Sequence, residues 1–514
     1  MAFVLALTLA ATAFAAPRAG DLTAGAVGDA NWVGFGVRDT DAFLNRPADS
    51  LLARAQKMAP MPEALGKLGA WDARLTATED FEKIDKFYLA VELKGDVTFD
   101  EINMAGNAKP ADFTVTAPAG ATVTPLAVVE TGDEQVKKLN MAVLERDGAK
   151  YLIAANGDPA LLAGLAASPE GNAAVVARTP ANLWIQAHLT KAFLEANNAD
   201  LPKDFDCEIG VEDTATSVKV TLWTNLYDEI CELASKELGK DLRAVFTGGA
   251  QKKAPLLFGT APLSALLNLS ASFLPENFKL ADIVPAEEAA EAEKQVMAQL
   301  AQVGFTWEDL VKQLRGNITL GFAGKLNAPM VGEIPGIYLN TTDVDVAKMT
   351  PLIDMAAQQL GGMVGKAEPY EANGWKGYKF SGMVSGLIVT GANGLLAAAM
   401  NEDQFGTVAE VELGMAAAVE PRNFALALNT KALQPVLKKL FETFGDQALE
   451  AAGEGAKSAK GIIKQVIDNM NMVDAVSLVA ADENTFVLEV TPNAGLVNMF
   501  LPAPEAPAEV KPAA

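Results

Sequence analysis

The chain has 514 residues, of which 50% are hydrophobic and 21% charged, and its 41 basic and 65 acidic side chains give a formal net charge of −24. This acidic excess argues against nucleic acid as a partner, because phosphate backbones are bound by clustered basic side chains. The apolar content excludes disorder over most of the length, and the length itself predicts about two to four domains.

The first 16 residues predict a cleavable signal peptide. Ala2 to Ala16 form an uncharged apolar run, and Ala13, Phe14 and Ala15 give the small-x-small pattern that signal peptidase reads. No basic residue precedes the run, so a short N-terminal anchor remains the alternative. The run is too short to span a bilayer, and no later segment is long and apolar enough to do so. We therefore expect an extracytoplasmic protein, periplasmic or secreted, with no transmembrane span.

Four pairs of segments that recur in the same order indicate a tandem duplication. One match contains Asp147-Gly148 in its first segment and Asn393-Gly394 in its second, which predict tight hairpin turns because both turn positions need positive φ. Another shares Thr-Lys-Ala, beginning at Thr190 and at Thr430. Coincidental similarity between strand-helix units is the alternative. The paired segments are 31–45 with 255–268, 139–167 with 387–411, 183–196 with 423–437, and 211–225 with 480–493.

The duplication predicts an α+β fold with two related halves, residues 29–250 and 251–501, each combining antiparallel hairpins with strand-helix units. In the first pair of segments, helices are expected after a strand at Ala42–Leu44 and at Ala265–Leu267. Residues 502–514 are rich in Pro and Ala and carry almost no core-forming side chain. They predict a disordered tail.

Three helices are predicted in the second half from their end signals and apolar periodicity. The first begins at Pro285, and the second begins at Thr350-Pro351 and ends at Gly361-Gly362. The third carries a stripe of apolar residues from Leu433 to Phe444 and is expected to end at Gly445. These stripes predict core packing.

The two cysteines, Cys207 and Cys231, are candidates for a disulfide in an oxidising compartment. Alternating apolar residues around Val220 predict a strand between them, and residues 227–238 predict a helix that carries Cys231. A bridge would stabilise the fold by about 3 kcal/mol through loop closure. Two buried free thiols are the alternative, and the spacing is not that of a redox motif.

The sequence offers no catalytic, cofactor-binding or metal-binding residues that can be assigned. His188 is the only histidine, which excludes sites built on several histidines. Its counterpart in the duplication is Leu428, so a structural strand residue is favoured over a catalyst. Aspartates that follow strands, at positions 39, 41, 343 and 345, are expected to cap helices rather than to bind calcium. Asn268, Asn317 and Asn340 match the N-glycosylation pattern.

Among the six tryptophans, Trp32 and Trp184 begin apolar strands and are expected to be buried, whereas Trp375 lies in a polar segment and is expected to be exposed. The 16 methionines suit either a core or an adaptable apolar groove.

No motif selects a function. We expect a non-enzymatic binding protein of unknown ligand, either a hydrophobic molecule or an envelope protein, with a cleft between the halves as its site. A secreted hydrolase that uses a pair of carboxylates is the alternative.

Overall fold

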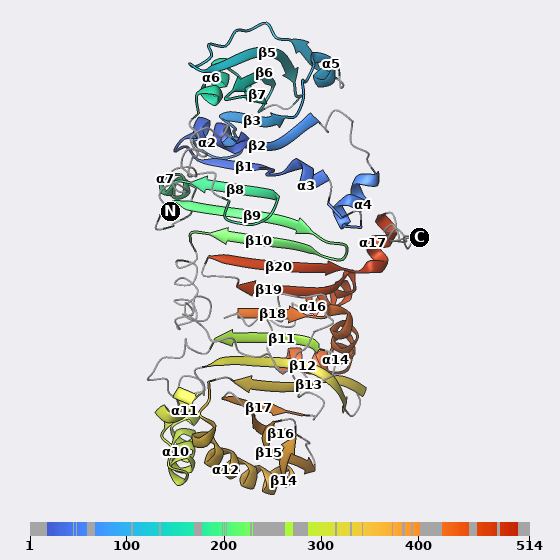
Figure 1. The fold of residues 1–514 in the computed structure, drawn as a ribbon. Coiled ribbons are helices and arrows are strands. Elements are labelled where there is room, and N and C mark those ends of the chain that lie inside the picture. The colour runs from blue at the N-terminus through green and yellow to red at the C-terminus, as the bar shows by residue number, and fades with distance from the viewer. Residues whose placement is uncertain are drawn as a thin grey trace, which may run out of the picture. The chain divides into compact units, whose positions relative to one another are not determined.

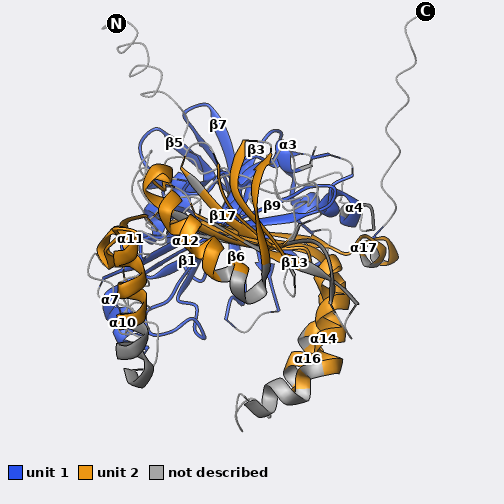
Figure 2. Cartoon of the chain, turned by 90° about the horizontal axis from the view of Figure 1, so that it is seen from below, with its two compact units in different colours: residues 1–226, 501–514 blue, residues 227–500 orange. Residues whose placement is uncertain are grey.

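The computed structural model describes residues 18–501 except for 59–66, 169–176, all but one residue of 227–262, 271–285, 401–423, 452–459 and some shorter gaps. The chain divides into two compact units (Figure 2). Unit 1 comprises residues 1–226 and 501–514, and unit 2 comprises residues 227–500. Both combine helices with antiparallel sheet (Figure 1), so the α+β prediction is confirmed.

In the described part of unit 1, ten strands form one sheet in which every pair of neighbours is antiparallel. Strand β1 lies in the interior of the sheet, between β8 and β2. Across the sheet, the order is β10 (Val218–Thr224), β9 (Phe205–Asp213), β8 (Leu183–Leu189), β1 (Trp32–Val37), β2 (Leu68–Thr76), β3 (Lys86–Leu93), β7 (Ala149–Asn156), β6 (Lys138–Arg146), β5 (Ala121–Glu130) and β4 (Ala108–Pro110).

The predicted turn between β6 and β7 is confirmed. Asp147 has φ 51° and Gly148 has φ 81°, and the two residues join the paired ends of the strands. Alternate residues of β7 face opposite sides of the sheet. Tyr151 and Ile153 belong to one apolar cluster, and Leu152 belongs to another, so β7 is buried on both faces.

The helices of unit 1 cover parts of the sheet. Helix α2 (Ala19–Val27) contacts β2, β3 and α6 (Ala160–Ala167), and it buries Leu22 completely. This helix was not predicted, and it precedes the expected start of the first half at residue 29. The other helices are α3 (Thr40–Leu44), α4 (Leu51–Met58), α5 (Phe99–Ile102) and α7 (Lys191–Ala196).

Unit 2 also has ten antiparallel strands among its described residues. Their order is β20 (Thr485–Pro492), β19 (Val473–Ala480), β18 (Phe424–Leu428), β11 (Leu263–Ser270), β12 (Asn317–Ala328), β13 (Gly332–Thr341), β17 (Leu395–Ala399), β16 (Gly386–Gly391), β15 (Trp375–Gly382) and β14 (Gly365–Ala372). When the strands of each unit are numbered from 1 to 10 along the chain, the two sheets have the same strand order.

The described helices of unit 2 include longer ones than those of unit 1. Helix α12 (Val346–Val364) contacts β14, β15 and β16, and α14 (Thr430–Ala451) contacts β11, β19 and α16 (Lys460–Asn469). Residues of α10 (Ala286–Gln302) and α11 (Trp307–Gln313) share an apolar cluster with α12. A short 3-10 turn (Met470–Met472) and α17 (Ala494–Phe500) complete the unit's described elements.

A polar pair recurs at the last hairpin of each unit. Asn225 donates from its side chain to Asp206 at 3.2 Å, and Asn493 donates in the same way to Asp474 at 2.8 Å. In both cases the asparagine is the residue directly after the hairpin's second strand. The hairpins predicted from 211–225 and 480–493 are therefore confirmed, with a matching polar contact that the sequence comparison did not anticipate.

Three helix predictions need correction. Ala265–Leu267 lies in strand β11, because β12 and β18 pair with it on both sides. Helix α12 begins at Val346 rather than at Thr350, because the Asp345 carboxylate accepts from the Lys348 amide at 3.2 Å and caps the helix one turn earlier. It also continues through Gly361-Gly362 to Val364.

The glycines expected to end two helices serve close packing instead. A Cβ at Gly361 would lie 3.2 Å from the Cβ of Ala367 in β14, so the glycine allows the helix to approach that strand. Gly445 lies inside α14, which continues to Ala451. The predicted start at Pro285 lies outside the described residues, and the described part of α10 begins at the next residue, Ala286.

Candidate functional site

A cluster of buried polar side chains lies on one face of the unit 1 sheet. Arg74 and Glu208 are fully buried, and Asp72 and Gln186 are at most 6% exposed. Charged side chains are rarely buried to this extent unless they are paired. We call the following set the polar cluster: Thr23, Arg38, Asp72, Arg74, Thr179, Gln186 and Glu208.

Strand register places the members of the cluster next to one another. In one row across the sheet, Glu208 pairs with Gln186, which pairs with Gly34, which pairs with Arg74. A Cβ at Gly34 would lie 3.1 Å from Cγ of Arg74, so glycine leaves room for the arginine stem on the neighbouring strand. Asp72 lies two residues before Arg74 on β2 and therefore faces the same side.

Arg74 is held mainly by Asp72, and its Nη2 also donates to Gln186 Oε1 at 3.4 Å. Its Nε and Nη2 donate to the two carboxylate oxygens of Asp72 at 3.0 and 3.2 Å, and its guanidinium carbon lies 4.1 Å from the ring centre of Trp32. The Nη1 atom is buried and has no hydrogen-bond acceptor. A buried charged donor without an acceptor is costly, so this atom is an unusual feature of the cluster.

Glu208, by contrast, is fully satisfied. Its carboxylate accepts from Gln186 Nε2 at 2.6 Å, from Arg38 Nη2 at 2.5 Å, and from both the amide and the hydroxyl of Thr179. Burial pushes the pKa of Glu208 up, but these hydrogen bonds, together with one from the Arg178 amide, outweigh it and hold the pKa below its usual value. Glu208 is therefore a fixed anion that anchors Gln186 and Arg38.

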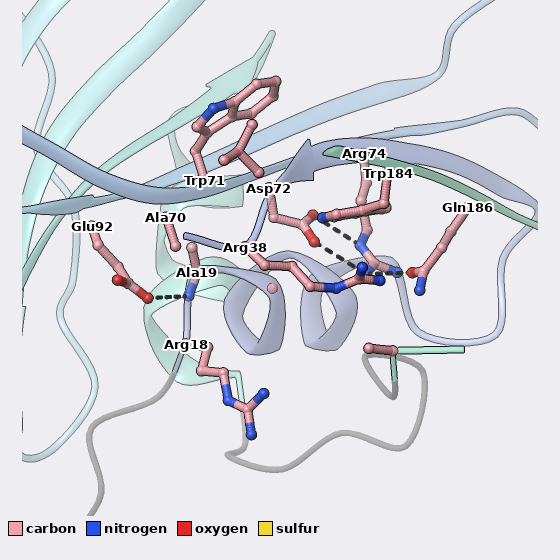
Figure 3. Close-up of a pocket in the computed structure, with 13 residues that line it drawn as sticks. Arg18, Ala19, Arg38, Ala70, Trp71, Asp72, Arg74, Glu92, Trp184 and Gln186 are labelled. Carbon is pink, nitrogen blue, oxygen red and sulfur yellow. Dashed lines mark hydrogen bonds and ion pairs between the residues drawn. The ribbon is translucent and has the colours of Figure 1, made fainter. Parts of the chain in front are cut away.

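A cavity of about 100 Å³ lies beside the polar cluster, and we call it the inner cavity (Figure 3). It takes in the first turn of helix α2 at Ala19 and Gly20. The side chains that matter for its chemistry are Arg18, Arg38, Asp72, Arg74, Glu92 and Trp184. The amino end of a helix carries partial positive charge and exposes amide donors, so it adds to the attraction that Arg74 exerts on an acceptor.

A second cavity of about 630 Å³ adjoins the first, and we call it the outer cavity. Arg18 and Glu92 line both. The outer cavity adds Lys94, Lys150 and Asp96, and within the described residues Lys150 pairs with Asp96 at 2.8 Å. Its volume falls within the range of small-molecule sites, and the inner cavity is smaller.

Glu92 has an unusual environment for a carboxylate. Burial raises its pKa, and amide hydrogen bonds from Ala19 and Ala70 and the charges of Arg18 and Lys94 offset this only in part. The Ala19 amide donates to Glu92 Oε1 at 3.4 Å. Among the described residues, no cation forms an ion pair with it within 4 Å. Figure 3 shows Glu92 and Gln186 toward opposite ends of the lining residues.

Unit 2 has leucines where unit 1 has this row. The Thr-Lys-Ala match sets the alignment, because Thr190 caps the helix after β8 and Thr430 begins the helix after β18. Strand pairing then carries it across the sheet. The row of Glu208, Gln186, Gly34, Arg74 and Tyr88 corresponds to Leu478, Leu426, Leu267, Leu320 and Leu339. An identical strand order thus does not require the polar cluster.

His188 lies in strand β8, as predicted, and outside both cavities. Its Nδ1 is 2.8 Å from the Asp206 carboxylate, and its ring stacks on Trp32 with centroids 6.3 Å apart. The hydrogen bond with Asp206 raises the pKa of His188, and burial opposes this. Asp206 also accepts a hydrogen bond from Asn225, so His188 belongs to the hydrogen-bond network of the β9–β10 hairpin.

The capping prediction is confirmed for Asp39 and Asp345, whereas Asp41 lies inside α3. The Asp39 carboxylate accepts from the Ala42 amide at 2.9 Å in α3, and Asp345 caps α12. Asp41 pairs with Lys94. Asp343 has φ 61° in the turn before α12. In the part of the chain that the structure describes, no group of three or more His, Cys, Asp or Glu side chains could hold a metal ion.

The tryptophan predictions are confirmed in two cases and wrong in one. Trp32 and Trp184 are each 5% exposed. Trp375, which was expected to be exposed, is also only 5% exposed and lies in an apolar cluster with Leu387 and Val389. The polar residues around Trp375 misled the prediction, because alternate residues of its strand face opposite sides.

Other predicted positions are only partly described. Cys207 lies in β9, where burial raises the pKa of its thiol to about 11, and Cys231 lies outside the described residues, so the disulfide remains a prediction. Asn268, Asn317 and Asn340 lie in strands β11, β12 and β13 of the unit 2 sheet. Residues 1–17, which include the expected signal peptide, and the tail after Leu501 are also outside the described residues.

Sequence reasoning missed every member of the polar cluster. The available signal was the segment Leu68–Thr76, in which Asp72 and Arg74 occupy alternate positions of an otherwise apolar strand. Two opposite charges on one face of a strand indicate a buried pair.

No helix among the described residues is long and apolar enough to cross a membrane. No protein-family model, curated protein or solved structure matches the chain.

Proposed function

We propose that the protein is an extracytoplasmic, non-enzymatic binding protein whose unit 1 takes a small polar ligand in the inner cavity. The observation that carries the proposal is the buried Nη1 of Arg74, a charged donor without an acceptor in the polar cluster that borders that cavity. A ligand oxygen that reached it would supply the acceptor that it lacks, beside donors that Asp72 and Glu208 already fix.

The comparison between the units supports a binding role over a structural one. We propose that the units arose by tandem duplication, since their strand orders match and the Asp206–Asn225 contact has a counterpart in Asp474–Asn493. In unit 2, leucines occupy the row that holds Arg74 in unit 1, and they are only partly buried, with Leu339 47% exposed. Buried ion pairs contribute little net stability. We therefore attribute the buried pair of unit 1 to binding.

The charged lining favours a polar ligand over the hydrophobic one that the composition suggested. Three arginines and two carboxylates surround the inner cavity, and desolvating them against an apolar molecule would cost free energy without new hydrogen bonds. An envelope protein partner and a cleft between the halves remain predictions from the sequence.

The test is a binding screen on the mature protein against small oxyanions, carboxylates and polar metabolites, read by thermal shift and confirmed by isothermal titration calorimetry. The matched control is the double variant Asp72→Ile/Arg74→Leu, which places the unit 2 residues on β2. We expect a ligand that stabilises the native protein and has no effect on the control. If every compound shifts both proteins equally, the inner cavity is not the binding site.

A hydrolase is the second candidate, and one observation favours it. Asp72 and Glu92 line the same cavity, and burial raises the pKa of Glu92 in the direction that a general acid requires. Against this, both oxygens of Asp72 are engaged by Arg74. Turnover of glycoside or ester substrates that Glu92→Gln abolishes would establish the hydrolase and displace the binding role.

A further inference from the structure

The polar cluster lies on one face of the unit 1 sheet, and the opposite face is apolar over the five neighbouring strands from β10 to β2 (Figure 1). We call this side of the five strands the apolar face. Because alternate residues of a strand face opposite sides, strand pairing aligns one row on it. The row consists of Leu222, Ile209, Ile185, Phe35 and Ala73. Ile185 is 44% exposed, Phe35 37% and Leu222 36%, so large apolar side chains meet solvent on three of the five strands.

The rows on either side of this one are apolar as well. One contains Val211 opposite Leu183, the other contains Val33, and all three side chains are partly exposed. The only charged side chain that the five strands place on this face is Asp213, at the end of β9. It forms a buried ion pair with Arg46 at 3.4 Å. The apolar face therefore offers a partner no free charge.

The two faces together reverse the usual pattern of an antiparallel sheet, in which the buried face is apolar and the solvated face is polar. Here the buried face holds Asp72, Arg74 and Glu208, and the exposed face holds aliphatic and aromatic side chains. Contiguous apolar patches of more than a few hundred Å² on a protein surface mark interaction sites. We therefore expect a partner to cover the apolar face.

The dimensions of the apolar face limit what can cover it. Five strands span about 24 Å across the sheet, and the seven residues of β8 span about 23 Å along it, which gives a flat area of roughly 550 Å². An amphipathic helix is about 10 Å wide and would cover less than half of this width. Another sheet of equal width would cover it completely, at a spacing of about 10 Å. Two such faces would together bury roughly 1,100 Å², which passes the lower limit of about 1,000 Å² for specific interfaces.

We infer that the apolar face is a self-association surface, on which two copies of the chain pack their unit 1 sheets face to face about a twofold axis. The same face of a second copy has the same width and the same twist, and it too has no free charge to desolvate. The formal charge of −24 on each chain opposes association, so the dimer should become tighter as salt screens this repulsion. The inference goes beyond the proposed function and does not depend on it.

The experiment is analytical ultracentrifugation of the mature full-length protein over a wide range of protein concentration, at low and at high salt. We expect a reversible monomer–dimer equilibrium whose dissociation constant falls as salt is added. Ile185→Asp should raise the dissociation constant at least about a hundredfold, because the dimer would bury a carboxylate without a partner. The exposed position keeps this carboxylate hydrated in the monomer. Ile185→Thr retains the β-branched shape and should raise the constant at least about tenfold, since apolar area is lost in both copies.

The matched control is Ile337→Asp, which adds the same charge at an isoleucine that is 46% exposed in strand β13 of unit 2. It should leave the dissociation constant unchanged, and circular dichroism verifies the fold of each variant. A protein that stays monomeric at every concentration, or a dimer that neither Ile185 variant weakens, would overturn the inference. A dimer that Ile337→Asp weakens as much as Ile185→Asp would also overturn it. A monomer that carries a co-purified apolar molecule or protein, which Ile185→Asp releases, would assign the apolar face to that partner instead.

Discussion

Replacing Arg74 by Leu, the residue at the corresponding position of unit 2, tests whether the polar cluster serves binding rather than stability. The side chains of Arg74 and Asp72 are 0% and 3% exposed and share two hydrogen bonds. Without Arg74, the Asp72 carboxylate stays buried with the Thr23 hydroxyl at 2.5 Å as its remaining described donor. Removing one partner of such a pair costs about 3–5 kcal/mol.

The double variant Asp72→Ile/Arg74→Leu should behave differently. It removes the uncompensated carboxylate together with the unpaired Nη1 donor, which is itself unfavourable by about 1–3 kcal/mol. Replacing a buried pair by apolar side chains is often neutral or stabilising. We therefore expect the free energy of unfolding of the double variant to lie within about 1 kcal/mol of the wild-type value. The coupling free energy between the two substitutions should be about 3 kcal/mol.

Native-state hydrogen exchange, read by mass spectrometry on peptides from β1, β2 and β8, is the suitable assay because it reports on unit 1 alone. Global unfolding of a chain with two units need not follow a two-state transition. The single variant should accelerate exchange in these strands strongly, and the double variant should restore protection. A single variant as protected as the wild-type protein, or a double variant less protected than the single one, would refute the reasoning.

Three further predictions concern unit 1 and the cysteines. Asp206 raises the pKa of His188 in the folded protein. The contribution of the pair to stability is therefore complete below the unfolded-state pKa of about 6.5 and is lost as pH rises through the folded-state pKa. His188→Leu should remove this part of the pH dependence of the urea midpoint. Gly36→Ala should destabilise by about 1–3 kcal/mol, since its Cβ would lie 2.2 Å from a backbone oxygen and 2.8 Å from an indole. Gly164→Ala, at an exposed position of α6 with open space around it, should stabilise by about 0.5–1 kcal/mol, and chemical denaturation compares the two variants. Alkylation of the denatured, unreduced mature protein should leave its mass unchanged if Cys207 and Cys231 are bridged, and addition of two alkyl groups would contradict the disulfide.

Local patterns predicted the elements that local physics determines. Asp147-Gly148 gave the turn between β6 and β7 because positive φ at two successive residues is a demand that few sequences meet. Asp39 was expected to cap a helix, and its carboxylate accepts from the Ala42 amide at 2.9 Å at the start of α3. These interactions span only a few residues, so the sequence carries them directly.

Tertiary context decided the elements that were predicted wrongly. Ala265–Leu267 has apolar residues that suit a helix, but pairing with β12 and β18 on both sides makes it a strand. Gly361 was expected to end α12, and instead it lets the helix approach β14. Helix α2 was missed because Ala-Gly-Asp at its start has weak helix propensity, and its burial against β2 and β3 compensates.

The candidate site could be foreseen only in part. Asp72 and Arg74 alternate within an apolar strand, which indicates a buried pair. Nothing local connects them to Gln186 and Glu208, which reach the same row through strand pairing across more than 100 residues. Glu92 is one of 65 acidic residues, and only its burial beside helix α2 distinguishes it.

The central claim is that the inner cavity of unit 1 is a ligand site, and native mass spectrometry of the mature protein purified from its own host tests it most directly. The account predicts a small polar molecule on the wild-type protein, identifiable after denaturing extraction, and its absence from Asp72→Ile/Arg74→Leu prepared in parallel. The same bound molecule on both proteins, or wild-type protein with no bound molecule that also fails the screen of polar compounds, would contradict it.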